Sequence, residues 1–280
     1  MRKDVLDAAK VLWRPLPWRG TRDPWHVLVS EVMLQQTQAS RVVGPYLRFV
    51  RRFPSPAACA AASRGDVVRA WAGLGYNRRA VRLHEAAARI VAVHEGAVPG
   101  TLADLEALPG VGPYTARAVL AFAFDEAVGV VDVNVARVLS RAVAGAPLRP
   151  REAQGVADGL APGPTAWRFN QALFDLGAQV CTARRPACGS CPLRRRCRWK
   201  AAGRPLPDPG AAGARQGRFE GSARQGRGRL VSALRTRPVP EEALADAAGW
   251  PGEHERARAA ADSLVRDGLA RWKGDVLALE

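Results

Sequence analysis

The sequence predicts an all-α body followed by a small module that combines helices and strands. Three observations lead to this fold class. Apolar residues recur at helical spacing over most of the first 180 residues, and no strand-like alternation of any length occurs before residue 228. Hydrophobic residues make up 48% of the 280-residue chain, which is enough for packed cores, and the length predicts two or three domains.

Local signals mark where the predicted helices of the body begin and end. Asp23 has the side chain of an N-cap and precedes Pro24, which suits the first helical position, so this helix is expected to run to about Gln36. Another helix is expected over residues 78–94, where apolar side chains recur at i+3 and i+4 and Gly96 follows. The remaining predicted helices cover residues 39–52, 64–72, 113–124, 132–144, 150–160 and 165–178.

The chain changes character after residue 200. Residues 201–228 are rich in Gly, Pro, Arg and Ala and lack an apolar period, which predicts a basic linker or strap. Residues 229–280 predict a winged-helix-like module. Its charge is nearly balanced, which favours contact with a partner protein or with the rest of the chain over DNA binding. The sequence does not identify that partner. Its expected helices cover residues 230–235, 241–248 and 254–267, and its expected strands cover 269–272 and 276–279.

The charge distribution narrows the possible functions. The net charge is +16, and residues 1–200 carry +14 of it, from 29 basic and 15 acidic residues. Such an excess is typical of proteins that bind nucleic acid. No run of about 18 apolar residues occurs, and the N-terminus lacks the apolar core of a signal peptide, which argues against membrane and secreted proteins. We expect a soluble, monomeric, cytoplasmic protein that associates with DNA.

Four of the five cysteines lie within a stretch of seventeen residues, Cys181, Cys188, Cys191 and Cys197, whereas Cys59 stands alone. In an intracellular chain, four thiols on one loop predict a metal centre rather than disulfides. Both zinc and an iron–sulfur cluster bind four thiolates. Only one pair has the short spacing of a zinc knuckle, so the 6-2-5 spacing favours a [4Fe–4S] cluster, and a structural role is expected for it.

Residues 108–112 (LPGVG) lie between two predicted helices. Gly110 and Gly112 permit a tight turn, and the free amides of such a turn, together with the N-terminus of the next helix, can bind a phosphate. An ordinary helix–helix turn has the same sequence pattern. The motif indicates a phosphate-binding turn only in combination with the basic charge of the body.

Two acidic residues occur in apolar surroundings. Glu31 lies in a strongly apolar helix, where a carboxylate is costly unless it is paired or protonated. Asp132 lies at a predicted helix start, where it is either an N-cap or an ionised carboxylate stabilised by the helix, and the two roles are compatible. An acid with a raised pKa beside an anion with a lowered pKa is the division of labour used in glycosidic cleavage.

Several motifs occur together, in the order in which they occur in a known family. By these motifs the chain resembles the helix-hairpin-helix DNA glycosylases of the endonuclease III superfamily, most closely the MutY adenine glycosylases. The resemblance covers about residues 10–200. The motifs that carry it are residues 16–19 (LPWR), 30–38 (SEVMLQQTQ), 71–76 (WAGLGY), 108–116 (LPGVGPYTA), 131–141 (VDVNVARVLSR), 168–171 (RFNQ), 175–177 (DLG) and the four spaced cysteines.

The resemblance implies a domain arrangement. Residues 19–127 would form a six-helix barrel that contains the helix-hairpin-helix, and residues 1–18 with 128–200 would form the [4Fe–4S] cluster domain. Many family members end in a Nudix-like domain that recognises 8-oxoguanine. The roughly 80 residues after the cysteines are too few for that domain.

The resemblance also assigns roles to individual residues. Glu31 would be the general acid that protonates adenine at N7, and Asp132 would stabilise the oxocarbenium-like sugar, with or without a covalent bond. Asn134 would help to orient this chemistry, Tyr114 would close the site over Asp132, and Gln171 would contact the flipped adenine.

Further residues would contact DNA. Gln35, Gln36 and Tyr76 match family residues that probe the strand opposite the excised base, with Tyr76 as a stacking wedge. Gly110 and Gly112 would hold a phosphate, and Arg19 is expected to be another DNA contact. At the position after Tyr76 the family often has a second Tyr, but this chain has Asn77, and Val133 replaces the usual Gly between Asp132 and Asn134.

The expected activity is excision of adenine opposite 8-oxoguanine or G in double-stranded DNA, during base excision repair. Bifunctional relatives cleave the strand through a lysine in the hairpin motif, where this chain has Tyr114, so a monofunctional enzyme is expected. Two alternatives remain: a glycosylase for T:G or U:G mismatches on the same scaffold, and a non-catalytic DNA-binding regulator that carries the cluster.

Overall fold

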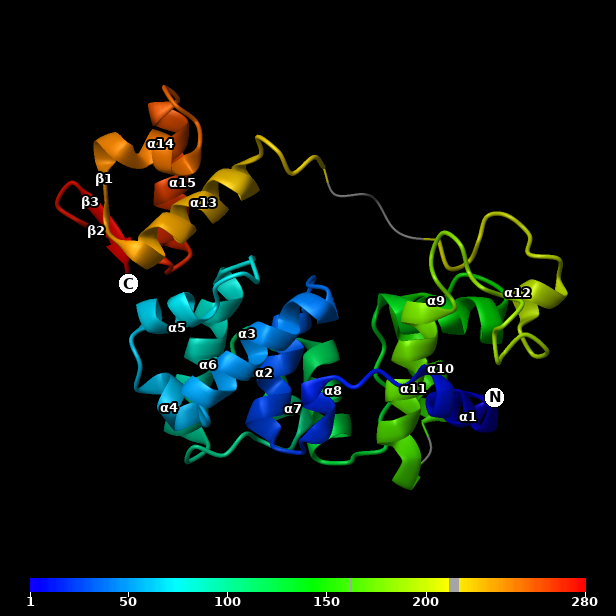
Figure 1. Cartoon of the computed structure of the whole chain (residues 1–280). Coiled ribbons are helices and arrows are strands. Elements are labelled where there is room, and N and C mark those ends of the chain that lie inside the picture. The colour runs from blue at the N-terminus through cyan, green and yellow to red at the C-terminus, as the bar shows by residue number, and fades with distance from the viewer. Residues whose placement is uncertain (162, 212–216) are drawn as a thin grey trace. The chain divides into compact units, whose positions relative to one another are not determined.

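The computed structural model describes residues 1–161, 163–211 and 217–280 of the chain (Figure 1). The predicted all-α body is confirmed, because every strand in these residues lies after residue 238. The chain divides into two compact units. Unit 1 comprises Met1–Val27, Gly100–Leu102 and Gly112–Ala214, and unit 2 comprises Leu28–Pro99, Ala103–Val111 and Arg215–Glu280.

Unit 1 is built around a helix in the second half of the body, α11. Phe169, Leu173 and Leu176 of this helix are fully buried in the unit's core. The N-terminal helix α1 packs along α11 through Val5 and Ala9, and this helix was not among the predicted ones. The elements of unit 1 are α1 (Arg2–Leu12), the 3-10 turn Pro17–Gly20, α8 (Pro113–Ala123), α9 (Val133–Leu139) with a π-helical turn (Ser140–Ala144), α10 (Pro150–Leu160), the 3-10 turn Gly163–Thr165, α11 (Ala166–Gln179) and α12 (Arg198–Ala201).

One helix, α2 (Pro24–Leu34), runs from unit 1 into unit 2. Its predicted start is confirmed, because the carboxylate of Asp23 accepts a hydrogen bond from the backbone N–H of His26 at 2.9 Å. The helix ends before the predicted Gln36, since Gln36 has a positive φ of 55° that no helix continues. The other helices of this part of unit 2 are α3 (Ala39–Arg52), α4 (Pro56–Ala60), α5 (Arg64–Ala70), α6 (Arg78–Val93) and α7 (Leu102–Glu106).

The C-terminal part of unit 2 has the predicted three helices and hairpin, and adds a short first strand. The strands form an antiparallel sheet in the order β1-β3-β2, which is the winged-helix arrangement. The hairpin pairs Trp272 with Leu277 and turns at Gly274, whose φ is +62°. Its elements are α13 (Ala223–Thr236), β1 (Val239–Pro240), the 3-10 turn Glu241–Ala243, α14 (Leu244–Ala248), α15 (His254–Arg266), β2 (Ala270–Lys273) and β3 (Val276–Leu279).

The predicted start of α13 was wrong. The helix begins at Ala223, inside the stretch expected to be a linker, rather than at residue 230. The side chain of Ser222 caps the helix by accepting a hydrogen bond from the backbone of Gln225. Gly226 then lies against the ring of Trp250, where a Cβ atom would come within 2.1 Å of the ring. Gly226 therefore serves close packing rather than chain flexibility.

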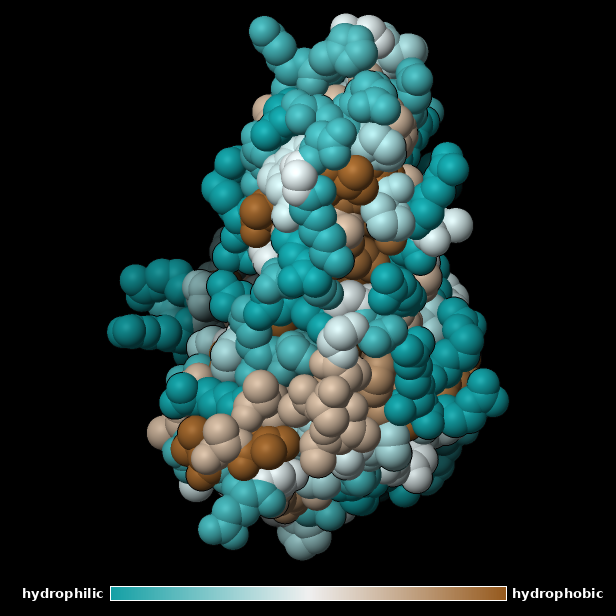
Figure 2. All heavy atoms as spheres, turned by 90° about the vertical axis from the view of Figure 1, so that its left-hand side faces the viewer, coloured by the Kyte–Doolittle hydropathy of each residue, from teal (hydrophilic) through white to brown (hydrophobic). Residues whose placement is uncertain are grey.

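No helix among the described residues is long and apolar enough to cross a membrane. The face drawn in Figure 2 is covered mainly by hydrophilic side chains, as the net charge of +16 leads one to expect.

A buried ion pair joins the N-terminal segment to α11. Asp175 is fully buried, and its carboxylate accepts hydrogen bonds from Arg14 at 2.5 Å and from both terminal nitrogens of Arg19 at 2.8 and 3.0 Å. Arg19 also lies over the ring of Trp13. Because removal of one partner leaves the other charge buried and unpaired, such a pair makes folding depend on every member.

We therefore expect Asp175→Ala to lower the free energy of unfolding by about 3–5 kcal/mol. Chemical denaturation followed by circular dichroism measures the change. The matched control is Asp7→Ala, which breaks an exposed pair with Lys10 and is expected to leave the midpoint unchanged. Equal midpoints for the Asp175 variant and the unmodified chain would contradict this role.

Candidate active site and metal centre

Asp132 is fixed as the N-cap of α9. One oxygen of its carboxylate accepts hydrogen bonds from the backbone N–H groups of Asn134 and Val135, at 2.9 and 2.7 Å. The other oxygen accepts a hydrogen bond from the side-chain amide of Asn134 at 2.8 Å. The side chain is half-buried at the helix N-terminus. The N-cap role is thus confirmed, and it holds the carboxyl group in one orientation.

The same network continues from Asn134 to the cysteine loop. The side-chain oxygen of Asn134 accepts a hydrogen bond from Arg137 at 2.8 Å. Arg137 also donates to the carbonyl of Gly177 at 2.8 Å and to the carbonyl of Cys181 at 2.7 Å. Burial lowers the pKa of the Arg137 guanidinium, and its hydrogen-bond partners are all oxygens. One buried cation therefore connects the support of Asp132 to the first cysteine of the loop.

The segment before Asp132 is held by α11. The side chain of Asn170 accepts a hydrogen bond from the N–H of Val130 at 3.0 Å and donates one to the carbonyl of Val128 at 2.9 Å. Asn170 was part of a motif but had no predicted role. The only signal for this role in the sequence is a polar residue among the apolar positions of a core helix. At Gly177, a Cβ atom would come within 2.8 Å of Asn134, so the close approach of α9 and α11 requires glycine.

Two other predicted site residues belong to unit 1. Tyr114 lies half-buried in the first turn of α8, which begins after Gly112 with Pro113 at its first position. Gln171 is 5% exposed on α11, next to Asn170. Glu31 belongs to unit 2, where it is 4% exposed in the apolar helix α2, as the sequence predicted. The pairing of Glu31 with Asp132 stays a prediction.

Three DNA-contact candidates, Gln35, Gln36 and Tyr76, lie on two loops of unit 2 that one side chain holds together. Arg79 donates hydrogen bonds to the carbonyls of Val32, Met33 and Gln35 at the end of α2, at 2.6 to 2.9 Å. It also donates to the carbonyl of Gly75 at 3.2 Å. Desolvation lowers the pKa of its guanidinium to about 10, so the group stays charged at neutral pH. Sequence reasoning missed this residue, because a basic residue in a basic chain carries no distinguishing signal.

Arg79 thereby fixes the surroundings of the predicted contacts. Gln36 is exposed with a positive φ, and Tyr76 is 43% exposed with a φ of +44°. A non-glycine residue at positive φ is strained and persists only when its neighbours hold it. The amide of Gln35 lies 3.5 Å from the carbonyl of Gly110, so the hairpin turn adjoins these loops. Gly110 has a φ of +79°, and a Cβ there would come within 2.7 Å of Arg82.

The expected DNA contact of Arg19 needs correction. This residue is only 7% exposed, and its guanidinium is bound to Asp175. A buried, paired cation has no free face for a phosphate, so Arg19 holds the N-terminal segment on α11.

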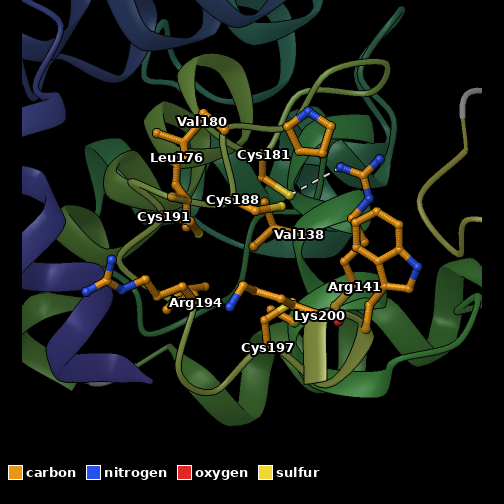
Figure 3. Close-up of a pocket in the computed structure, with 15 residues that line it drawn as sticks. Val138, Arg141, Leu176, Val180, Cys181, Cys188, Cys191, Arg194, Cys197 and Lys200 are labelled. Atoms are coloured by element: carbon orange, nitrogen blue, oxygen red, sulfur yellow. Dashed lines mark hydrogen bonds between the residues drawn. The ribbon is translucent and has the colours of Figure 1, made fainter. Parts of the chain in front are cut away.

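The four cysteines of the loop line one pocket, as Figure 3 shows. The pocket has about 400 Å³ of empty volume, part of it open to solvent, and Val138, Leu176 and Val180 form its apolar wall. Four cysteine side chains on one pocket are the ligand set of a thiolate-bound cluster.

The thiols lie among apolar side chains, and three cationic residues, Arg141, Arg194 and Lys200, also line the pocket. Burial raises the pKa of Cys191 to about 11 and raises that of Cys197. Binding of metal reverses this preference, because a coordinating thiol is deprotonated. Arg141 is 1% exposed and approaches the sulfur of Cys181 at 3.5 Å, where it would offset the charge of a thiolate.

Arg141 is itself held by the cysteine loop and by the chain that follows it. It donates hydrogen bonds to the carbonyls of Thr182 and Ala183 at 2.8 and 3.0 Å and pairs with the carboxylate of Asp208. The hydrogen bond from Arg141 lowers the pKa of Asp208. Residue 208 lies in the predicted linker, so at this point the linker contacts the π-helical turn after α9, which corresponds to the strap alternative.

Comparison with known proteins agrees with this geometry. Residues 29–154 match the model of the HhH-GPD superfamily of base excision DNA repair proteins, and residues 181–197 match the iron–sulfur binding domain of endonuclease III. The adenine DNA glycosylase of Mycobacterium tuberculosis is 47% identical over 95% of this chain and 90% of its own length. The adenine DNA glycosylase of Mycolicibacterium smegmatis is 45% identical over 94% of this chain and 89% of its own length.

Solved structures show the same fold. A thermostable thymine-DNA glycosylase is 30% identical, with a TM-score of 0.68, over 71% of this chain and 95% of that one. The endonuclease III of a non-covalent complex with DNA is 24% identical, with a TM-score of 0.63, over 73% of this chain and 97% of that one. Fold and site thus define a helix-hairpin-helix DNA N-glycosylase with a [4Fe–4S] cluster. Within that class, the chain belongs to the adenine DNA glycosylase family.

Replacement of a loop cysteine is expected to remove the cluster. In Cys197→Ser, the purified protein should lose its brown colour and its bound iron and sulfide, because one of four thiolate ligands is gone. Absorption spectra with iron and sulfide assays measure the loss. The control is Cys59→Ser, since this thiol is fully buried in unit 2 and is not part of the cysteine pocket. Colourless wild-type protein with bound zinc would contradict the assignment.

Proposed function

We propose that the chain is a monofunctional adenine DNA glycosylase that excises adenine opposite 8-oxoguanine or G in duplex DNA. The observation that carries the proposal is the carboxylate of Asp132, which three hydrogen bonds hold at a helix N-terminus in a chain 47% identical to an adenine DNA glycosylase. The proposal keeps the predicted domains: a barrel of residues 19–127, a cluster domain of residues 1–18 with 128–200, and a C-terminal module.

Two carboxyl groups would share the chemistry. Adenine is a poor leaving group, so the bond between N9 and C1′ breaks only as the ring gains a proton. Glu31, buried in the apolar helix α2, would supply this proton to N7. The bonding electrons leave with the base, and the sugar becomes an oxocarbenium-like cation. Asp132 would stabilise this cation until water attacks C1′.

Other residues would hold the flipped adenine and keep Asp132 oriented. The side-chain amide of Asn134 donates a hydrogen bond to the second carboxylate oxygen of Asp132 and would keep this oxygen in its orientation during the reaction. Gln171 would hydrogen-bond to the base, and Tyr114 would cover the site from α8. On the opposite strand, Tyr76 would stack into the gap and the amides of Gln35 and Gln36 would probe the unpaired base. Gly110 and Gly112 of the hairpin would present backbone amides to a phosphate.

Strand cleavage is not part of the proposal. A lyase of this superfamily needs a lysine in the hairpin motif, and position 114 is tyrosine. The four lysines of the chain are Lys3, Lys10, Lys200 and Lys273, all outside that motif.

A second candidate is thymine excision from T:G mismatches. It is favoured by the similarity to a thymine-DNA glycosylase at 30% identity and a TM-score of 0.68. The higher identity to adenine DNA glycosylases ranks it below adenine excision.

Single-turnover base release tests the proposal on duplexes that carry A:8-oxoG, A:G, T:G and U:G, with and without hot alkali. We expect adenine release, with strand breaks only after alkali. Asp132→Asn and Glu31→Gln should each slow release by about 10²–10⁴-fold, as loss of a positioned acid or charge does. The control is Asp104→Asn on the short helix α7. Thymine release would favour the second candidate, and binding without release would favour a non-catalytic regulator.

A further inference from the structure

The winged-helix module is not a free appendage of unit 2. Arg64 on α5 pairs with Glu280 at 2.7 Å, and Arg78 on α6 pairs with Asp267 at 3.4 Å. A Cβ at Gly65 would come within 2.7 Å of the carbonyl of Glu280, so the backbone of α5 and the last residue of the chain are closely packed. The module is therefore seated on α5 and the start of α6.

One contact of the module reaches a functional loop. Arg235 near the end of α13 donates from Nε to the carbonyl of Val68 at 3.1 Å and from a terminal nitrogen to Oδ1 of Asn77 at 2.8 Å. Burial lowers the pKa of this guanidinium, and the oxygens of Val68 and Asn77 that accept its hydrogen bonds are both uncharged. A cation that is desolvated in this way is oriented by its hydrogen bonds, and it orients its acceptors in turn.

Asn77 directly follows Tyr76, in the loop of residues 73–77, which we call the wedge loop. Other side chains hold the remaining polar groups of this loop. Arg41 donates to the carbonyl of Gly73 at 2.8 Å, and the indole of Trp71 donates to that of Gly75 at 3.2 Å. Tyr76 has a φ of +44°, which the loop has to maintain at a cost in strain. The winged-helix module adds one hydrogen bond to these contacts, the one from Arg235 to the side chain of Asn77.

We propose that Arg235 of the winged-helix module is a positioning residue for the wedge loop: through its hydrogen bond to Asn77 it holds Tyr76 in the strained conformation that stacks into the strand opposite the excised base. The module thereby acts on opposite-strand recognition through the barrel, without reading DNA itself. Its nearly balanced charge agrees with this role, since residues 229–280 contain 8 basic and 9 acidic residues. The inference rests on the proposed function of Tyr76.

The test compares two variants that both weaken docking of the module. Arg235→Met keeps the length of the side chain but loses both hydrogen bonds, including the one to the wedge loop. Arg64→Met loses the ion pair with Glu280, which does not involve the wedge loop. Arg237→Met, an exposed arginine on the same segment, controls for lost charge. Melting temperatures establish that each variant is folded.

Two readouts follow in the full-length protein. The first is single-turnover adenine release from an A:8-oxoG duplex. The second is the fluorescence of 2-aminopurine placed beside the opposite base, which rises when the strand is unstacked by a wedge. We expect Arg235→Met to lower both, the release rate about tenfold, because a charge-assisted hydrogen bond is lost. Arg64→Met and Arg237→Met should retain the wild-type fluorescence change.

The variants at the loop complete the test. Asn77→Ala should reproduce the effect of Arg235→Met, and the double variant should be no slower than either single one. In a Tyr76→Ala background, Arg235→Met should have no further effect. Equal losses in Arg235→Met and Arg64→Met would overturn the proposal, because docking alone would then explain both. If wild-type protein releases no adenine, the proposed function fails instead, and the fluorescence signal still reports on the wedge.

Discussion

The orientation of Asp132 depends on a hydrogen-bond chain that begins at the cysteine loop. The backbone carbonyl of Cys181 accepts from Arg137, Arg137 donates to Asn134, and Asn134 donates to the carboxylate. Each link joins a different part of unit 1: the loop, the middle of α9 and the N-terminus of α9. A cluster that fixed the loop would therefore also support the orientation of the carboxylate. This would give the structural role expected from the sequence a physical reason in a hydrolytic enzyme.

Arginine side chains organise both units from within. Arg79, Arg137 and Arg141 each donate to several backbone carbonyls, in loops or in the last turn of a helix, where the helical ladder leaves carbonyls without a partner. A guanidinium suits this task because its donors lie in a rigid plane and it remains charged when partly buried. Arg19 is bound to a buried carboxylate in the same way. The net charge of +16 thus overstates the charge that is free to face DNA.

Regular elements and the motifs of the site were predictable from the sequence, because caps, prolines and apolar spacing are local signals. The helix at Ala39–Arg52 has the predicted bounds, and Asp23 caps α2 as expected. The N-terminal helix was missed, although Val5, Ala8 and Ala9 follow helical spacing, because a short helix of eleven residues depends on packing against α11. The start of α13 was missed because its glycines signal flexibility until Trp250 is known to lie against one of them.

Side-chain partners were beyond the sequence. Nothing local distinguishes Arg19, which is buried on Asp175, from an arginine that faces a phosphate, and the two residues are far apart in the chain. Asn77 stood out only as a departure from a family pattern until Arg235 was found to bind it. Long-range pairs of this kind depend on how the helices pack. A single sequence, considered by itself, does not show which side chains the packing brings together.

The link from the cysteine loop to the carboxylate is tested most directly at Arg137. In Arg137→Gln, the side chain no longer spans Cys181, Gly177 and Asn134. The measurement is single-turnover adenine release at equal cluster content, judged by visible absorption. We expect release to fall at least about tenfold, the effect of one lost charge-assisted hydrogen bond, while the cluster and DNA binding are retained. Wild-type release by a variant that lacks these hydrogen bonds would contradict it.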